Sequence, residues 1–413
     1  MTATTRPVRT TTPAQWLRKN LFRTPLDSVL TLILAPLSLY ALYLAARFVF
    51  VTGRWEIVEV NLKLLMVGNW PIDHMARISV TLVAFGFLGG IVAGLVHARQ
   101  VRRGTASVLN MSRRERILDL ARRFGLILFT VLLLLALTST WGPTITAVGV
   151  VVAGVAGRVV GGILGRLHLP KPVAIVLVLL MLSTPFLLYF YLVDAVPLAR
   201  WEGFWFNLSS AAAGIILCFP LGVLIAIGRR SKLPLIRGMS TIYVELVRGV
   251  PFFVLLLMAH VALEFFVPAS IAPSRPVRAI VVFTIFTAAY LAEIVRGGLQ
   301  SVPRGQEEAA RAVGLSPFSV MSRIVLPQAL RNVIPAQIGQ FISLFKDTVL
   351  AGLAMSIFDM AQVASAITQQ SAFRGQGLIV ETLTFTAFLF WVGAYTMSRE
   401  SQRLERKLGV GTR

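Results

Sequence analysis

Two short segments of this sequence repeat the same arrangement of opposite charges inside apolar surroundings. In VELVRG, Glu245 precedes Arg248 by three residues, and in AEIVRG, Glu293 precedes Arg296 by three. Residues three apart share one face of a helix, so we expect each pair to close there. Isolated charges in an apolar helix are costly, which favours mutual pairing or the bracing of a gate. Direct contact with a substrate is the alternative for these four side chains.

A third charged segment lies further along the chain, where Lys346, Asp347 and Thr348 interrupt another apolar run. A charged pair well inside such a run usually faces the interior of a helix bundle or a water-filled path. This segment is therefore a candidate for a substrate pathway.

The stretch QEEAARAVGLSPFSVMSRIVLPQ, from Gln306 to Gln328, has the turn chemistry of two short helices. Gly314 suits the left-handed cap of the first helix, Ser316 suits the N-cap of the second, and Pro317 suits its first turn. Such a pair is typical of a DNA-binding helix-turn-helix, but also of a corner between longer elements. Pro327 predicts a break before the chain continues.

Several kinds of catalytic chemistry have no residues to support them here. The sequence contains no G-x-x-x-x-G-K-[ST] phosphate loop, so a partner would have to hold any ATP that drives the protein. Its four histidines lack metal-ligand spacing, and no Ser/His/Asp or Cys/His set is suggested. The single cysteine, Cys218, excludes an intrachain disulfide. We therefore expect a protein that is not an enzyme and holds no cofactor or metal.

Composition places these segments in a membrane, because 56% of the 413 residues are hydrophobic and only 14% are charged. A bilayer core about 30 Å thick needs about 20 apolar residues per helix. On that criterion we predict an all-α polytopic protein with about ten transmembrane helices, at residues 29–50, 78–97, 124–141, 143–164, 173–193, 206–228, 240–266, 277–297, 328–357 and 377–398. A re-entrant pair within residues 124–164 would leave eight crossings.

The 40 basic and 18 acidic residues give a formal net charge of +22, which in a soluble protein would suggest nucleic acid binding. In this sequence the basic residues gather in alternate loops, as expected when cytoplasmic loops retain Lys and Arg. The Arg-rich segment 98–123 marks the cytoplasmic side. Counting from it, we predict a multi-pass protein of the bacterial inner membrane with both termini in the cytoplasm.

This topology changes the meaning of the stretch from Gln306 to Gln328, which falls in a cytoplasmic loop between the eighth and ninth spans. A DNA-binding pair needs a free face and usually a dimer that presents two recognition helices. A loop tethered by spans on both sides presents neither easily. Small Ala309 and Ala310 would instead let a partner surface approach closely, and Glu308 would offer it one anionic anchor.

The pattern Glu-Ala-Ala, three residues, Gly, nine residues, Ile, one residue, Leu-Pro resembles the EAA loop of binding-protein-dependent ABC importer permeases. This chain matches it without a gap, at Glu308, Ala309, Ala310, Gly314, Ile324, Leu326 and Pro327. In that family the loop forms a coupling helix that docks in a cleft of the ATPase subunit. The resemblance therefore implies a coupling loop at residues 303–327 and a permease core like that of type I ABC importers.

Flanking segments are similar to the polar amino acid uptake permeases. They are VELVRGVP, YLAEIVRGGLQSVPRGQEEAA, LPQALRNVIP and LFKDTVLAGL, and the closing SRESQRLERKLGVGTR looks like the general L-amino acid permeases. By this resemblance, the segment from Lys346 to Thr348 lines the region near the translocation pathway. The likeness implies a permease core at residues 201–413 with about five spans, preceded by an N-terminal extension at residues 1–200 with about five more.

The resemblance also implies the partners: an ABC ATPase subunit, a second homologous permease, a periplasmic amino-acid-binding protein and membrane lipid, with no nucleic acid. Our prediction is thus an inner-membrane permease subunit that translocates amino acids. The alternative is an ion- or proton-coupled secondary transporter, with Glu264, Glu293 and Asp347 as ion or proton sites. A membrane-tethered transcriptional regulator is a third reading. Copurification with an ATPase that carries a phosphate loop would separate the three.

Overall fold

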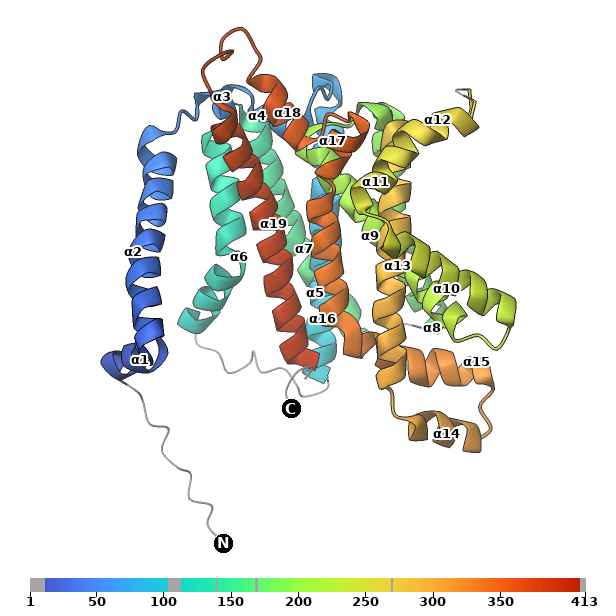
Figure 1. Cartoon of the computed structure of the whole chain (residues 1–413). Helices are drawn as coiled ribbons and strands as arrows, with labels where there is room; N and C mark the ends of the chain where they lie inside the picture. The colour runs from blue at the N-terminus through green and yellow to red at the C-terminus, as the bar shows by residue number, and fades with distance from the viewer. Residues whose placement is uncertain (1–11, 103–112, 139, 168–169, 269, 409–413) are drawn as a thin grey trace. The chain divides into compact units, whose positions relative to one another are not determined.

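A computed structural model of the chain describes residues 12–102, 113–138, 140–167, 170–268 and 270–408 (Figure 1). The chain divides into two compact units, Met1–Trp55 and Glu56–Arg413. In the described ranges there is no β-strand, only one isolated bridge between Gly203 and Asp359. The all-α prediction is confirmed. The predicted division at residue 200 follows family resemblance rather than contacts, and it stays a prediction.

The first unit contains one long apolar helix. This helix is α2 (Pro25–Arg47), which follows the short helix α1 (Pro13–Asn20) and continues into the π-helical turn η1 (Phe48–Thr52). At the start of α2, the Thr24 hydroxyl accepts from the Asp27 amide and the Asp27 carboxylate accepts from the Thr24 amide. This capping box satisfies two amides at the helix start. No residue of α2 is buried within the unit, as suits a helix surrounded by lipid.

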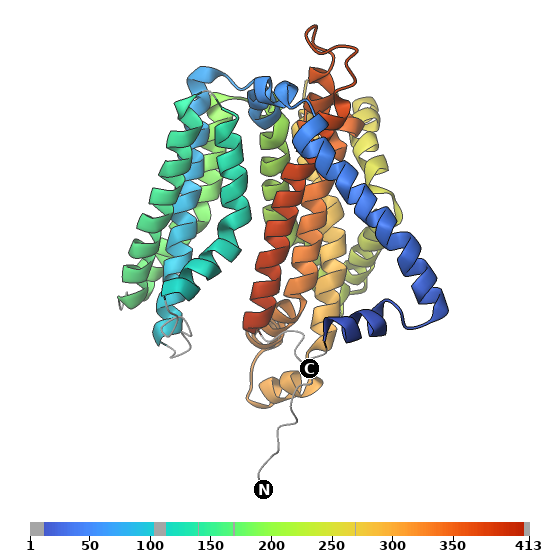
Figure 2. The ribbon, with the colours of Figure 1, turned by 90° about the vertical axis from the view of Figure 1, so that its left-hand side faces the viewer.

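The second unit begins with short helices and continues into four long ones. These elements are α3 (Glu56–Val60), α4 (Leu62–Val67), η2 (Ile72–His74), α5 (Met75–Arg102), α6 (Arg113–Ala136), α7 (Trp141–Arg166) and α8 (Lys171–Ala195). Figure 2 shows α5 to α8 as a group of steep helices beside the rest of this unit. The α5 and α7 helices have the most extensive contact of any helix pair in the described chain.

Glycines allow the backbones of α5 and α7 to touch. A Cβ atom on Gly90 would lie 2.2 Å from the Gly154 carbonyl oxygen, and one on Gly94 would lie 2.3 Å from the Arg158 carbonyl oxygen. From the other helix, a Cβ atom on Gly161 would lie 2.2 Å from the Ile91 carbonyl oxygen. Small residues permit this approach between membrane helices, where van der Waals packing replaces the hydrophobic effect.

Gly161 and its neighbour Gly162 offer a matched test of this packing. We expect Gly161→Ala to destabilise the protein by about 1–3 kcal/mol, since the new methyl group would overlap backbone that cannot move aside easily. Gly162→Ala meets no atom within 4 Å and should change stability little. Thermal unfolding of the two purified variants in detergent measures the difference. Equal unfolding midpoints would show that the backbone contact between α5 and α7 is unimportant.

The remaining helices form the second part of this unit. They are η4 (Leu198–Arg200), α9 (Gly203–Arg229), α10 (Pro234–Gly249), α11 (Phe252–Leu257), η5 (Met258–Ala262), α12 (Leu263–Phe266), α13 (Arg275–Ser301), α14 (Arg304–Ala312), α15 (Pro317–Ser319), η6 (Val320–Val325), α16 (Leu326–Asp347), α17 (Leu350–Met355), α18 (Met360–Ile367) and α19 (Ile379–Leu408). The most buried of the long helices is α13, which packs against α9 and α16. This central position suits a helix that carries functional charges.

Seven described helices are long and apolar enough to cross a membrane, or eight if the bent pair of α10 with α11 and η5 counts as one span. The other two predicted spans, at residues 124–141 and 328–357, correspond to α6 and to α16 followed by α17. Only Gly125–Ala136 of α6 is strongly apolar, and α16 does not meet the same test of length and hydropathy. The predicted span at 240–266 is not one straight helix, because the chain bends by 102° between α10 and α11, before Pro251. Proline disfavours helical backbone at the preceding residue, Val250.

Candidate functional site

Four charged residues gather around Glu293, at the end of α13 that leads toward α14. One Glu293 carboxylate oxygen accepts a hydrogen bond from Arg229 Nη1 at 2.6 Å, and Arg296 Nε donates to both oxygens at 3.0 and 3.1 Å. Arg248 Nη1 lies 3.9 Å from the same carboxylate. We call these three arginines, Glu293 and Glu245 the Glu293 cluster. It joins α9, α10 and α13 by charge.

The pairing within the Glu293 cluster confirms one sequence prediction and corrects another. The predicted pair of Glu293 with Arg296 is present. Among the described ion pairs Glu245 has Arg229 as its partner, at 3.1 Å, in place of the expected Arg248. Arg248 instead lies over the Tyr290 ring, 5.2 Å from its centroid. The ion pair of Glu245 with Arg229 of α9 therefore forms in place of the i, i+3 pair within α10.

Arg229 is the member of the Glu293 cluster that sequence reasoning missed. Its position at the end of α9 made it one of the basic residues flanking a span. Its side chain is only 14% exposed and bridges Glu293 and Glu245, which lie on two other helices. The cluster contains three cations and two anions, so one positive charge is uncompensated within it. The apolar run that ends at Arg229 could have indicated that this side chain is buried. The sequence could not have indicated its partners, because Glu293 and Glu245 reach Arg229 only in the folded chain.

The segment from Lys346 to Thr348 forms a separate group at the end of α16. Lys346 is exposed, Asp347 is partly buried, and Thr348 is fully buried. Neither charge has an ion pair with the Glu293 cluster among the described residues. The predicted site residues thus fall into two groups rather than one.

Thr348 belongs to a buried polar network that the sequence did not suggest. Its hydroxyl donates to the Phe345 carbonyl at 2.8 Å and accepts from the Asn207 amide at 3.2 Å. The Asn207 amide group also contacts the Asp359 carboxylate at 3.4 Å, and its oxygen accepts from the Met360 amide at 3.0 Å. Asp359 caps α18 by accepting from the Gln362 amide at 2.9 Å. Three distant parts of the chain meet at this network.

Burial raises the pKa of Asp359 to about 6, while hydrogen bonds to its carboxylate, from the Gln362 amide and then Asn207, oppose the rise. Its charge is therefore costly, and the hydrogen bonds offset part of that cost. Space is tight as well, since a Cβ atom on Gly352 would lie 2.3 Å from the Asp359 carboxylate. The network fixes how the chain continues after α16.

The EAA loop (residues 303–327) projects from the end of the second unit, as Figures 1 and 2 both show. Its first helix, α14, ends at Ala312, and Gly314 follows in the left-handed region with φ +82°. Ser316 caps α15 by accepting from the Ser319 amide at 3.4 Å, and Pro317 occupies the first turn. The predicted turn chemistry of the loop is confirmed.

The helix after Ser316 differs from the prediction at Pro327. No break occurs there, because helical backbone runs from α15 through the π-helical turn η6 into α16, with Leu326 and Pro327 in the first turn of α16. A proline has no amide hydrogen, and the shifted hydrogen bonds of a π-turn accommodate that loss. The expected corner is therefore a continuous helix with one widened turn.

The EAA loop has a buried side and an exposed side. Ala310 is 6% exposed and belongs to a hydrophobic cluster with Val320 and Val325 of the loop and with Val295 and Leu299 of α13. The opposite side carries exposed Glu308 and Ala309. Ile324 is partly buried against the same cluster.

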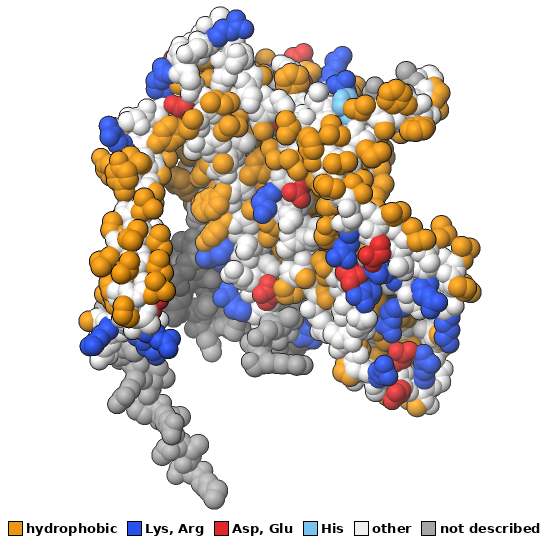
Figure 3. All heavy atoms as spheres, viewed as in Figure 1, with side chains coloured by type: hydrophobic (Ala, Val, Ile, Leu, Met, Phe, Trp, Pro, Cys, Tyr) orange, Lys and Arg blue, Asp and Glu red, His pale blue; other side chains and the backbone are white. Residues whose placement is uncertain are grey.

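Two apolar side chains on the exposed side of the EAA loop were not predicted as site residues. Val313 is 77% exposed and Phe318 is 80% exposed. Charged side chains gather on this part of the surface in the view of Figure 3, whereas hydrophobic side chains cover most of α2 and α12. A combination of exposed apolar and charged groups is suited to a protein partner.

Comparison with known proteins identifies the family of this chain. The family described as binding-protein-dependent transport system inner membrane component matches residues 218–409. The permease protein BztC of a glutamate/glutamine/aspartate/asparagine transport system from Rhodobacter capsulatus is 31% identical over 97% of this chain and 95% of its own length. The chain belongs to the amino-acid ABC importer permeases. The likeness to BztC includes the N-terminal spans.

Other permeases match the C-terminal half. The inner membrane amino-acid ABC transporter permease YhdY of Escherichia coli is 37% identical over 54% of this chain and 60% of its own length. The probable glutamine ABC transporter permease GlnP of Bacillus subtilis is 35% identical over 50% of this chain and 91% of its own length. A solved structure, of an amino acid ABC transporter with histidines, covers 49% of this chain and 90% of its own, with 27% identity and a TM-score of 0.44.

Membership in this family establishes the general role of the protein. An amino-acid ABC permease is a transport subunit of the inner membrane, and ATPase activity lies in a separate subunit. Such permeases work with an ATPase and a substrate-binding protein. The permease prediction is confirmed in preference to a secondary transporter or a transcriptional regulator.

Proposed function

We propose that the EAA loop of this permease docks on the ATPase subunit through the side that carries Glu308 and Ala309. The exposed Val313 and Phe318 would add apolar contacts to that anionic anchor. The observation that carries this proposal is the two-sided character of the loop. One side, with Ala310 and Ile324 of the EAA pattern, is packed into the second unit, and the other side leaves Glu308 and Ala309 of the pattern exposed.

The packing of the loop provides a route for movement. Ala310, Val320 and Val325 share a hydrophobic cluster with Val295 and Leu299 of α13. Glu293 lies on the same helix, within two turns of Leu299. A displacement of the loop by the ATPase would therefore move α13 and strain the ion pairs that hold α9 and α10 to it. We propose that the Glu293 cluster braces a gate that opens and closes in this way.

The identity of the other partner proteins and the orientation of the chain in the membrane are part of the same proposal. This chain pairs with a second homologous permease and receives substrate from a periplasmic amino-acid-binding protein, and both of its termini lie in the cytoplasm. The name of BztC mentions glutamate, glutamine, aspartate and asparagine. Since that relative is similar over nearly the whole chain, we propose polar amino acids as the substrate class.

Copurification tests the docking proposal. The permease is expressed in its host with an affinity tag, and the captured proteins are sequenced. We expect an ATPase subunit that carries a phosphate loop to be retained. Transport of amino acids by the purified permease alone, driven by an ion gradient and without ATP, would contradict the proposal.

Lys346 is the residue that we propose for contact with the carboxylate of the substrate, with Asp347 near its ammonium group. Lys346 is exposed and lies next to Asp347 in the sequence, so a substrate can reach its ammonium group. We expect Lys346→Ala to reduce uptake by about ten-fold or more, as loss of one charged hydrogen bond does. ATPase stimulation and assembly should be normal. Unchanged uptake in a fully assembled variant would exclude the proposed contact.

A further inference from the structure

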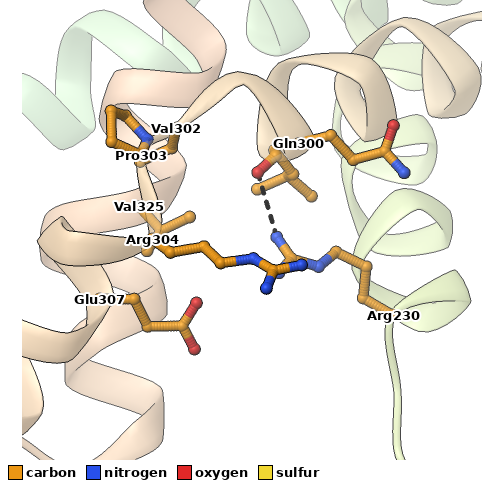
Figure 4. A pocket seen from close by; sticks show the side chains of 8 residues that line it. Arg230, Gln300, Val302, Pro303, Arg304, Glu307 and Val325 are labelled. Carbon is orange, nitrogen blue, oxygen red and sulfur yellow. Dashed lines mark hydrogen bonds between the residues drawn. The ribbon is translucent and has the colours of Figure 1, made fainter.

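A cavity of about 340 Å³ lies where the EAA loop leaves α13, and nothing in the transport mechanism above uses it. Its lining comes from the end of α9, the end of α13, the start of α14 and the end of η6. The lining residues are Arg230, Leu299, Gln300, Val302, Pro303, Arg304, Glu307 and Val325 (Figure 4).

Two guanidinium groups approach the cavity from different helices. Arg304 extends from the first turn of α14, and Arg230 extends toward it from the end of α9 (Figure 4). Arg230 Nη1 donates to the Leu299 carbonyl at 3.3 Å. Neither arginine has an acidic partner within the part of the chain that the structure describes. Like charges that converge in this way repel each other unless an anion lies between them.

The carboxylate in the cavity wall is already neutralised. Glu307 Oε1 accepts from Arg311 Nη2 at 2.6 Å, one turn further along α14. The charge that remains available is therefore that of Arg230 and Arg304, which is two positive charges. A zwitterion carries no net charge and would leave both of these charges uncompensated, whereas a dianion would balance them.

We propose that this cavity binds a doubly charged oxyanion of the phosphate or phosphate-monoester class, held between the guanidinium groups of Arg230 and Arg304. The planar guanidinium presents paired N–H donors that match two oxygens of such an anion. Apolar Val302, Pro303 and Val325 also line the cavity. The anion could come from free phosphate or from the headgroup of a lipid such as phosphatidic acid.

The bound anion would connect α9 to the first turn of the EAA loop. It would thereby restrict the displacement of the loop that coupling requires, a consequence that rests on the proposed docking function. Binding itself does not depend on the ATPase, so it is measured on the permease alone. Failure of the anion proposal and failure of the docking proposal are thus distinguishable.

The test measures binding to the purified full-length permease in neutral detergent at constant ionic strength. Calorimetric titrations use inorganic phosphate in one arm and the soluble lipid dihexanoyl phosphatidic acid in the other, with free glutamine as the zwitterionic comparison. The variant Arg230→Gln/Arg304→Gln removes both guanidinium groups. The control Arg237→Gln/Arg323→Gln removes two exposed arginines outside the cavity.

We expect saturable binding of at least one phosphate probe, weakened about ten-fold or more by Arg230→Gln/Arg304→Gln and unchanged in the control. Binding of phosphatidic acid alone identifies a lipid source, and binding of inorganic phosphate identifies a free anion. The single variant Arg304→Gln replaces the double variant if the latter does not fold. No binding of either probe, equal loss in the control, undiminished binding in the double variant, or tighter binding of glutamine would overturn the proposal.

Discussion

Glu308→Lys is expected to abolish ATP-driven uptake while the permease still reaches the membrane. Glu308 is exposed on the free side of the EAA loop, so its replacement removes no internal contact. Reversal of a charge in a docked interface costs about 2 kcal/mol or more, equivalent to about 30-fold weaker docking. Uptake of labelled amino acid and copurification of the ATPase should both fall. Membrane abundance of the permease should be unchanged.

The matched control is Glu59→Lys, on α3. Glu59 is also exposed, and the substitution makes the same change in charge, but α3 and α14 lie at opposite ends of the second unit (Figure 1). This variant should retain uptake and the ATPase. Wild-type uptake by the Glu308→Lys protein would refute the assigned docking side. A loss of uptake with normal copurification of the ATPase would show that Glu308 acts after docking and not in docking itself.

Glu293→Gln is the second substitution with a large expected effect. It leaves three arginines of the Glu293 cluster with Glu245 as the sole carboxylate among them. Removal of one partner from a fully buried ion pair costs about 3–5 kcal/mol. The Glu293 side chain is 27% exposed, so water reduces the cost, and we expect about 2 kcal/mol. Thermal unfolding of the purified protein should show a lower midpoint, and uptake should fall with the loss of the gate brace.

Glu245→Gln is the matched control within the same cluster. Glu245 is 63% exposed, and its ion pair among the described residues is with Arg229, so its loss should cost less than about 1 kcal/mol. The unfolding midpoint should therefore fall much further for Glu293→Gln than for Glu245→Gln. Equal midpoints would show that the cluster does not depend on Glu293 as its common partner.

The parts of the structure that depend on near neighbours were predictable from the sequence. Gly314, Ser316 and Pro317 specify their turn through their own backbone preferences, and the structure has that turn. Glu293 and Arg296 pair because three residues place them on one helix face. The long apolar runs give helices since a membrane-spanning chain must satisfy its amides internally.

The contacts that were missed join distant parts of the chain. Arg229 meets Glu293 across 64 residues, and Asn207 meets Asp359 across 152. Residues this far apart cannot be paired from helical periodicity in the sequence. They meet because α9 packs against α13 and α18. The bend before Pro251 was missed for a different reason: hydropathy averages over a window and does not register one proline.

The glycine contact between α5 and α7 has a consequence for how the protein is made. The ribosome synthesises α5 before α6 and α7. If α5 enters the bilayer first, the side of α5 that carries Gly90 and Gly94 has only lipid beside it until α7 arrives. That face is completed when Gly157 and Gly161 emerge and the two helices meet. A nascent chain arrested within α6 would expose an unfinished surface that membrane quality control could recognise.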